Sequence, residues 1–295
     1  MKDSFSKCHP AVNFLFYTGA IVMGMCYHHP VFLGCSVILS LAYYICIKRQ
    51  WFSYMASMMG IWMVVAVINP LFNTRGETVL FTYLEGRAFT WEALCYGIGN
   101  GAIFITTLTW FATYHDVMTS DKFLYCFGKL APTVSLILTM VFRLIPTFLS
   151  KARQIGTARK CIGKSTENGT FYEKAQHGMM IVSSLTTWAL EGGVTTADSM
   201  QSRGFGSGKR TSFSICSLKK KDIVLLVWEV VLIISILGCT LQGGMDVSFF
   251  PEIEMSGWKE RWTLIGMIGY VLFLSIPVGI NLVEEIAWRI LKSKI

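Results

Sequence analysis

Six apolar runs, each about long enough to cross a bilayer as a helix, constrain the fold of this chain more than any other feature. A spanning helix needs roughly 20 mostly apolar residues. Hydrophobic residues make up 53% of the chain and charged residues only 15%, whereas soluble domains carry about 25% charged residues. The sequence therefore predicts an all-α integral membrane protein with about six transmembrane helices. The runs cover 11–27, 31–47, 54–68, 93–111, 223–241 and 262–283.

The stretch between residues 115 and 222 contains no run that is both long and uncharged. Its best candidate, 130–142, has 13 residues and is bounded by Lys129 and Arg143. Each charge near the centre of a span costs about 2.5–3.5 kcal/mol on insertion scales. Extending this run in either direction would bury a charge, so we predict that it does not cross the membrane.

Apolar residues in this stretch instead recur three or four positions apart, which is helical spacing. One row runs over 137–155 and a second over 181–192. The pattern predicts two long amphipathic helices, the second over 171–203. Pro146 is expected to kink or split the first helix, and Gly192-Gly193 is expected to bend the second.

Basic residues concentrate in the same part of the chain. Half of the 26 Lys and Arg lie between residues 143 and 221, together with four acidic residues. Six spans place this segment and both termini on one side of the membrane, and cytoplasmic loops are enriched in Lys and Arg. We therefore predict a multi-pass protein of the plasma membrane with cytoplasmic N- and C-termini. Its parts are transmembrane helices 1–4 (1–113), a cytoplasmic helical region (114–221) and transmembrane helices 5–6 (222–295).

The sequence carries no motif for catalysis, metal binding or nucleotide binding. No aspartates stand in a D-x-x-D or D-x-x-x-D spacing, and the nine cysteines include no C-x-x-C pair. Gly208-Lys209 resembles part of a P-loop, but Arg203 and Arg210 stand where that motif needs Gly and Ser or Thr. Nucleic acid is not an expected partner, because the basic excess fits cytoplasmic membrane loops. The basic segment could lie on anionic lipid, form an interfacial enzyme site, or dock a soluble partner.

Two arginine-centred triplets close the two amphipathic helices. Ser202-Arg203-Gly204 stands within the long polar stretch 197–211, and Ala158-Arg159-Lys160 stands at the end of the first helix. Gly is the usual residue just past a helix C-terminus, because it adopts the left-handed conformation without a clash. A cation there suits the negative end of the helix dipole. On spacing alone, a capped helix end accounts for Ser202-Arg203-Gly204.

With its neighbours along the chain, this pattern resembles the transmembrane T component of energy-coupling factor (ECF) transporters, the EcfT/CbiQ family. The likeness spans most of the chain. One position departs from the family pattern, because the first motif commonly has Gly where Lys160 stands. The pieces that carry the likeness are His9-Pro10, Asn69-Pro70-Leu71-Phe72 with Gly76, Trp91-Glu92-Ala93-Leu94 with Tyr96-Gly97, Arg143-Leu144-Ile145-Pro146, and Ala197-Asp198-Ser199-Met200 with Ser202-Arg203-Gly204-Phe205-Gly206 and Gly208-Lys209-Arg210-Thr211.

The resemblance implies an energy-coupling subunit with no catalytic activity of its own, which needs no cofactor or metal. Two ATP-binding-cassette (ABC) ATPases would bind ATP and Mg²⁺, and each would hold one arginine in a groove, where a guanidinium can pair bidentately with a carboxylate. A small membrane S component would bind the substrate, a vitamin or a metal ion. The implied ATPase-docking residues are Ala158, Arg159, Lys160, Ser202, Arg203 and Gly204. The implied S-component-facing apolar stripe is Ile137, Val141, Leu144, Ile145, Phe148, Ile181, Leu185 and Trp188.

An ABC permease with its own substrate path is the alternative transport function. Such a path is usually marked by polar or charged residues within the spans. Asn100 and Glu229 are the midspan candidates, and we expect Glu229 to pair with another side chain within the helix bundle.

Overall fold

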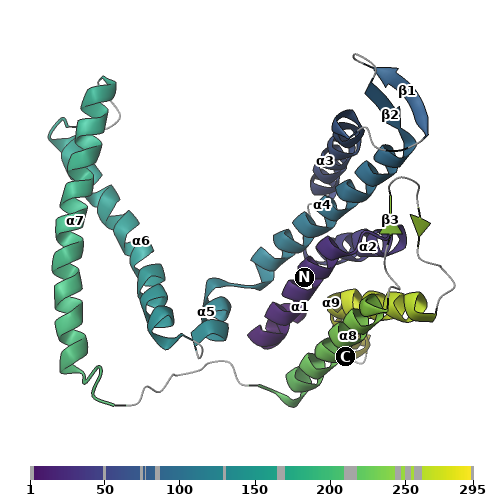
Figure 1. Ribbon diagram of the computed structural model, residues 1–295. Coiled ribbons are helices and arrows are strands. Elements are labelled where there is room, and N and C mark those ends of the chain that lie inside the picture. The colour runs from purple at the N-terminus through teal and green to yellow at the C-terminus, as the bar shows by residue number, and fades with distance from the viewer. Residues whose placement is uncertain are drawn as a thin grey trace. The chain divides into compact units, whose positions relative to one another are not determined.

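The computed structural model describes residues 3–48, 51–73, 76, 78–83, 87–128, 131–164, 170–208, 218–242, 247–249, 254–255 and 261–293. Regular structure in these residues is almost entirely helical (Figure 1). The chain divides into two units. Unit 1 comprises Met1–Cys126 and Cys216–Ile295, and unit 2 comprises Phe127–Ile215. The prediction of an all-α membrane protein is confirmed.

Unit 1 contains the bundle of apolar helices and two short antiparallel hairpins, β1 with β2 and β3 with β4. A short helix, α5, reaches from unit 1 to the first residues of unit 2. The bounds of these elements are η1 (Phe5–Lys7), α1 (Pro10–Cys26), α2 (Pro30–Ile47), α3 (Trp51–Phe72), β1 (Val79–Tyr83), β2 (Arg87–Thr90), α4 (Trp91–Val117), α5 (Ser120–Gly128), α8 (Lys220–Leu241), β3 (Val247–Ser248), β4 (Glu254–Met255) and α9 (Arg261–Ser293).

Among the described residues, six helices are long and apolar enough to cross a membrane: α2, α3, α4, α8, α9 and α6 (Pro132–Cys161), which belongs to unit 2. The number agrees with the sequence prediction, but the membership differs. Helix α1 is apolar with only 17 residues. Helix α6 qualifies because its 30 residues contain an 18-residue window with a mean hydropathy of 1.7 and no more than two charges. The chain is a multi-pass membrane protein.

Two His-Pro pairs start the first two helices. His9 and His29 are N-cap residues, and their Nδ1 atoms accept hydrogen bonds from the backbone N–H groups of Ala11 and Val31 at 3.2 and 3.4 Å. Each following proline occupies the first helical turn, where its lack of an N–H costs nothing. Burial lowers the pKa of His29, which favours the neutral imidazole that an accepting nitrogen requires.

Aromatic side chains from four helices fill the core of unit 1. The ring of Phe16 in α1 lies 5.3 Å from Trp110 in α4 and 5.2 Å from Phe273 in α9, measured between centroids. Tyr43 of α2 lies 5.9 Å from Trp110. All four side chains are fully buried. Helix α1 is therefore the centre of the bundle, although it is the shortest of its apolar helices.

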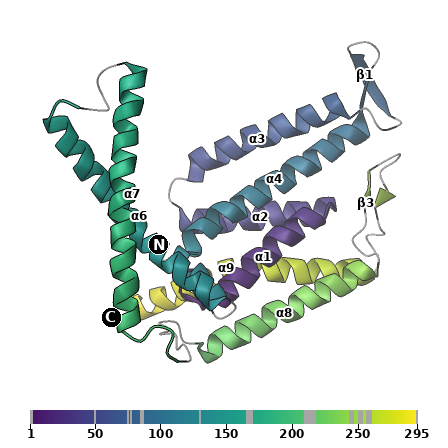
Figure 2. The ribbon, with the colours of Figure 1, turned by 60° about the vertical axis from the view of Figure 1, so that its left-hand side comes forward.

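Helices α3 and α4 lie side by side in both views (Figure 1 and Figure 2), and two glycines of α4 allow their close approach. A Cβ on Gly97 would lie 2.7 Å from the carbonyl oxygen of Ala66 and 3.0 Å from the Cβ of Asn69. A Cβ on Gly101 would collide with the Trp62 ring. Small residues let helix backbones pack closely in membranes, where the hydrophobic effect does not drive helices together and van der Waals packing matters more.

Two local features of the chain lie next to this helix pair. The apolar pieces before and after residues 84–86 pair as the antiparallel β1–β2 hairpin. The third span was expected to end before Asn69-Pro70, but α3 continues through Pro70 to Phe72. Proline disfavours helix at the preceding residue, yet Asn69 is helical and lies close to Gly97 of α4.

Candidate functional site

Unit 2 is built from two long helices that pack against each other, α6 and α7 (Phe171–Ser202). Both segments predicted to be amphipathic helices are helical, although α6 is also apolar enough to be a candidate span. Helix α6 is one continuous helix that includes Pro146, so it is not split there, and α7 is continuous through Gly192-Gly193. Helix α7 starts with a capping box, in which Thr170 and Glu173 satisfy each other's backbone N–H groups. These hydrogen bonds hold the pKa of Glu173 below its usual range.

The two helices run antiparallel, as their contacts show. Phe148 of α6 meets Trp188 of α7 edge to face, with centroids 5.5 Å apart. One turn further along α6, the ammonium of Lys151 lies 5.8 Å from the centre of the same Trp188 ring. Near the end of α6, the guanidinium Nη2 of Arg159 lies 3.3 Å from Nδ1 of His177. As the residue number increases along α6, the number of the contacted residue in α7 decreases, as expected for antiparallel helices.

The α7 C-terminus carries Arg203 as its C-cap residue, with an exposed side chain. The N–H of Phe205 donates to the Met200 carbonyl at 3.0 Å, and the N–H of Gly204 donates to the Gln201 carbonyl at 2.9 Å. Gly204 has φ +78°. This is a complete Schellman motif, so the predicted glycine-capped end is confirmed. The last residues of the predicted motif, Lys209, Arg210 and Thr211, lie outside the described residues.

The α6 C-terminus ends in the same Schellman motif, but Arg159 is not its C-cap residue. The N–H groups of Lys164 and Gly163 donate to the carbonyls of Arg159 and Lys160 at 3.0 and 3.1 Å, and Gly163 has φ +74°. The capping glycine is thus Gly163, so Lys160 does not need to be glycine. Arg159 lies in the last turn instead of at the helix tip, and it is half-buried against His177.

The two arginines lie at opposite ends of the helix pair. Arg159 contacts α7 at His177, and Arg203 follows 26 positions later along the continuous helix. At 1.5 Å per residue this separates them by about 39 Å along α7. That length is greater than the diameter of a small domain, about 30 Å. The arrangement therefore offers two separate attachment points and not one composite site.

The predicted apolar stripe divides into two sets. Its four members on the N-terminal half of α6 are exposed by 43–55%: Ile137, Val141, Leu144 and Ile145. The other four, which lie on both helices, are half-buried along the α6–α7 pair: Phe148, Ile181, Leu185 and Trp188. Of these two sets, the first is the one that is exposed and therefore open to a further partner.

Replacing Trp188 by alanine is expected to loosen the α6–α7 pair. The substitution removes the aromatic pair with Phe148, which contributes about 0.5–1.5 kcal/mol beyond burial, together with the Lys151 contact. Amide exchange in 171–190 should accelerate about tenfold, because exchange reports local opening. Leu190→Ala is the control, since Leu190 is 68% exposed. Equal exchange in the two variants would show that the pair is not held at Trp188.

Two further motifs of the sequence meet in unit 1. The carboxylate Oε1 of Glu92 accepts hydrogen bonds from the Thr78 hydroxyl at 2.5 Å and from its N–H at 3.3 Å. Gly76 has φ +129°, and a Cβ there would collide with the Glu92 carboxylate. Only glycine fits at position 76, because its φ is positive and the Glu92 carboxylate occupies the space of a side chain. This contact fixes the link between α3 and α4.

Glu229 and Asn13 are fully buried polar side chains of α8 and α1. Within the described residues, neither carboxylate oxygen of Glu229 has a hydrogen-bond partner, and the same holds for the Asn13 amide. The expected pairing of Glu229 is therefore not found there. No group of three or more His, Cys, Asp or Glu that could hold a metal ion occurs among the described residues.

Sequence reasoning missed the roles of His177 and Gly163. Both lie near the α6–α7 turn, and their roles depend on the contact between the helices. A glycine four positions after Arg159 would have been a usable sign, because it marks a helix end one turn later than the triplet suggests.

Comparison with known proteins gives one partial match. A stretch of 101 residues is 25% identical to the energy-coupling factor transporter transmembrane protein EcfT of Lactobacillus helveticus (strain DPC 4571). The match covers 34% of this chain and 36% of the relative's length. No protein-family model matches the chain. The chain is thus a multi-pass membrane protein with a distant likeness to a transporter component.

Proposed function

We propose that this chain is the energy-coupling transmembrane subunit of an ECF-type ABC importer. It links ATP hydrolysis by two partner ATPases to substrate uptake through a small S component. It is not an enzyme and binds no cofactor, since ATP and Mg²⁺ belong to the ATPases. It lies in the plasma membrane, with the α6–α7 pair and both termini on the cytoplasmic side.

The observation that carries the proposal is the placement of Arg159 and Arg203. Each lies on the last turn or cap of a long helix that ends in a Schellman motif, and the two are about 39 Å apart along α7. A guanidinium is permanently charged and offers a planar set of donors, so it suits a carboxylate-lined groove. Two such points at this separation fit two ATPases better than one. The distant likeness to EcfT supports the same function.

The exposed half of the apolar stripe supports the proposal of a third partner, the small S component. Ile137, Val141, Leu144 and Ile145 cover one helix with apolar side chains in a segment that also carries many basic residues. Apolar surface of this kind marks membrane or protein interaction sites. We assign it to the small S component, which would choose the substrate.

Purification in mild detergent with mass spectrometry of the co-purifying proteins tests the proposal. Two ABC ATPases together with a small separate membrane protein are expected. The identity of the small protein would then give the substrate class. A chain that purifies folded and alone would contradict the proposal.

The permease alternative has one observation in its favour. Glu229 is fully buried in α8 without a hydrogen-bond partner among the described residues, and intramembrane ionisable groups often mark a substrate or ion route. The same purification separates the two functions, because a permease would retain ATPases but no small membrane partner.

A further inference from the structure

The segment Asp3–His9, which precedes the first helix, contacts five helices at one end of unit 1: α1, α2, α5, α8 and α9. Its centre is anchored by Phe5, which is fully buried and lies 5.3 Å from the Phe16 ring and 6.3 Å from the Tyr43 ring. The proposed docking function does not use this segment, although His9-Pro10 is one of the pieces that carry the family likeness.

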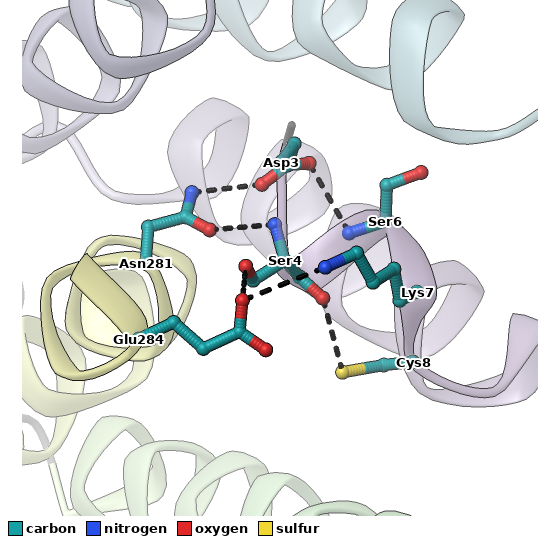
Figure 3. A network of polar contacts seen from close by, with 7 residues as sticks. All are labelled: Asp3, Ser4, Ser6, Lys7, Cys8, Asn281 and Glu284. Atoms are coloured by element: carbon teal, nitrogen blue, oxygen red, sulfur yellow. Dashed lines mark hydrogen bonds and ion pairs between the residues drawn. The ribbon is translucent and has the colours of Figure 1, made fainter. Parts of the chain in front are cut away.

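Towards α9 the segment is fixed by a network of polar contacts, shown in Figure 3. Asn281 donates from its amide to the Asp3 carboxylate at 2.7 Å and accepts from the N–H of Ser4 at 2.9 Å. The Ser4 hydroxyl donates to Glu284, and Lys7 forms an ion pair with the same carboxylate at 3.6 Å. Tyr43 of α2 donates to the other oxygen of Asp3 at 3.0 Å.

A cavity of about 420 Å³ lies beside this network, lined in part by Asp3, Glu284 and Glu285. Each of these carboxylates already has a partner in the protein, since Glu285 pairs with Arg289 at 2.6 Å. Because these carboxylates bind groups of the protein itself, we interpret the cluster as a structural contact between the segment and α9.

The other contacts of the segment reach the two places where the chain leaves unit 1 and returns to it. The chain leaves through α5, where the ammonium of Lys122 donates to the carbonyl and, at 3.0 Å, the hydroxyl of Ser6, and to the Val117 carbonyl at 2.8 Å. In the same helix, the Tyr125 hydroxyl lies 3.3 Å from Nε2 of His9.

The chain returns at the start of α8. There the N–H of His9 donates to Oδ1 of Asp222 at 3.3 Å, and the other oxygen of Asp222 accepts from the N–H of Lys219 at 3.1 Å. His9 thus contacts both α5 and the start of α8, which we call the two stems. Because its Nδ1 accepts from Ala11, the neutral ring carries its proton on Nε2 and donates to Tyr125.

We infer that the segment Asp3–His9 is a clamp that fixes α5 and the start of α8, the two segments of unit 1 that connect to unit 2, to the membrane bundle, with His9 and Lys122 as its positioning residues. A force on α6 or α7 reaches the bundle through these two stems. Holding both against one buried anchor makes them move together. This inference deepens the proposed function, because coupling needs a firm connection between the docking helices and the transmembrane helices.

Hydrogen exchange of the full chain in detergent tests the clamp. Lys122→Met removes three donated hydrogen bonds at nearly constant length. His9→Asn keeps an oxygen that caps α1 but is too short to reach Tyr125. Each variant should speed exchange about tenfold or more in 120–128, with a rise in 219–224 as well, because His9→Asn loses one of these hydrogen bonds and Lys122→Met loses three. Lys122→Arg should restore slow exchange. Arg289→Met, which removes an exposed ion pair at the same end, is the matched control.

Unchanged exchange at both stems in Lys122→Met would overturn the clamp. So would an equal rise in α3 and α4, because that indicates general loss of stability. If Lys122→Met does not fold, His9→Asn and Tyr125→Phe provide the test. In the assembled transporter, the clamp variants should keep the ATPases bound but take up less substrate per ATP hydrolysed. If the unaltered chain binds no ATPase, the proposed function fails while the exchange result still decides the clamp.

Discussion

The double variant Arg159→Glu with Arg203→Glu is expected to lose its ABC ATPases entirely on purification. Each substitution replaces a donor by a carboxylate where the partner groove is expected to present carboxylates. Truncating one side of a buried hydrogen-bonded charge pair costs about 2–5 kcal/mol, and like charges add to this cost. Even the lower figure at both sites amounts to roughly a thousandfold loss of affinity. Co-purification followed by mass spectrometry measures the result.

The control for this experiment is Arg153→Glu with Lys174→Glu. These two residues lie on the same helices, are exposed and carry the same charge, so the change in net charge is identical. This pair should retain the ATPases. Arg203→Glu should cost more than Arg159→Glu, because Arg203 is exposed at a helix end while Arg159 is partly covered by His177. Intact assembly of the Arg159, Arg203 double variant would rule out the docking function.

Gly97→Ala should destabilise the membrane bundle by about 2–3 kcal/mol, the upper range for overpacking. The added methyl group would lie 2.7 Å from the backbone carbonyl oxygen of Ala66. A backbone atom cannot rotate away as a side chain can, so α3 would have to move off α4. The move would also disturb the Glu92–Thr78 contact that joins the two helices. Unfolding in mixed micelles with increasing denaturing detergent gives the change in stability.

Gly60→Ala provides the matched comparison, because Gly60 lies in α3 with no atom within 4 Å of the added Cβ. This variant should be as stable as the parent, or more stable by about 0.5–1 kcal/mol, since alanine is the better helix former. Similar stability of the two alanine variants would mean that α3 and α4 do not pack through Gly97.

Local patterns were sufficient to predict the helices and some of their ends. The apolar runs predicted α2 and α8 to within a few residues, and Gly204 correctly marked the end of α7. Proline was a poorer guide. Pro70 and Pro146 both lie inside continuous helices, because packing and the surrounding helical hydrogen bonds outweigh the one that a proline removes.

The contacts between distant parts of the chain had no local signature. The hydrogen bond from His9 to Asp222 joins residues 213 positions apart, and nothing in either neighbourhood points to the other. The same is true of Asn281 and Asp3. The position of Arg159 within the last turn was also missed, since it depends on a glycine beyond the recognised triplet. Such features follow from how the elements pack.

The continuity of α7 has a mechanical consequence. Trp188, held against Phe148, divides the helix into an arm of about 23 Å towards Arg203 and one of about 17 Å towards His177, at 1.5 Å per residue. A stiff rod that turns about such a fulcrum moves its ends in opposite directions. A shift of about 3 Å at Arg203 would become one of about 2 Å at the other end. With such a rotation the helix would be a lever that reduces travel and increases force.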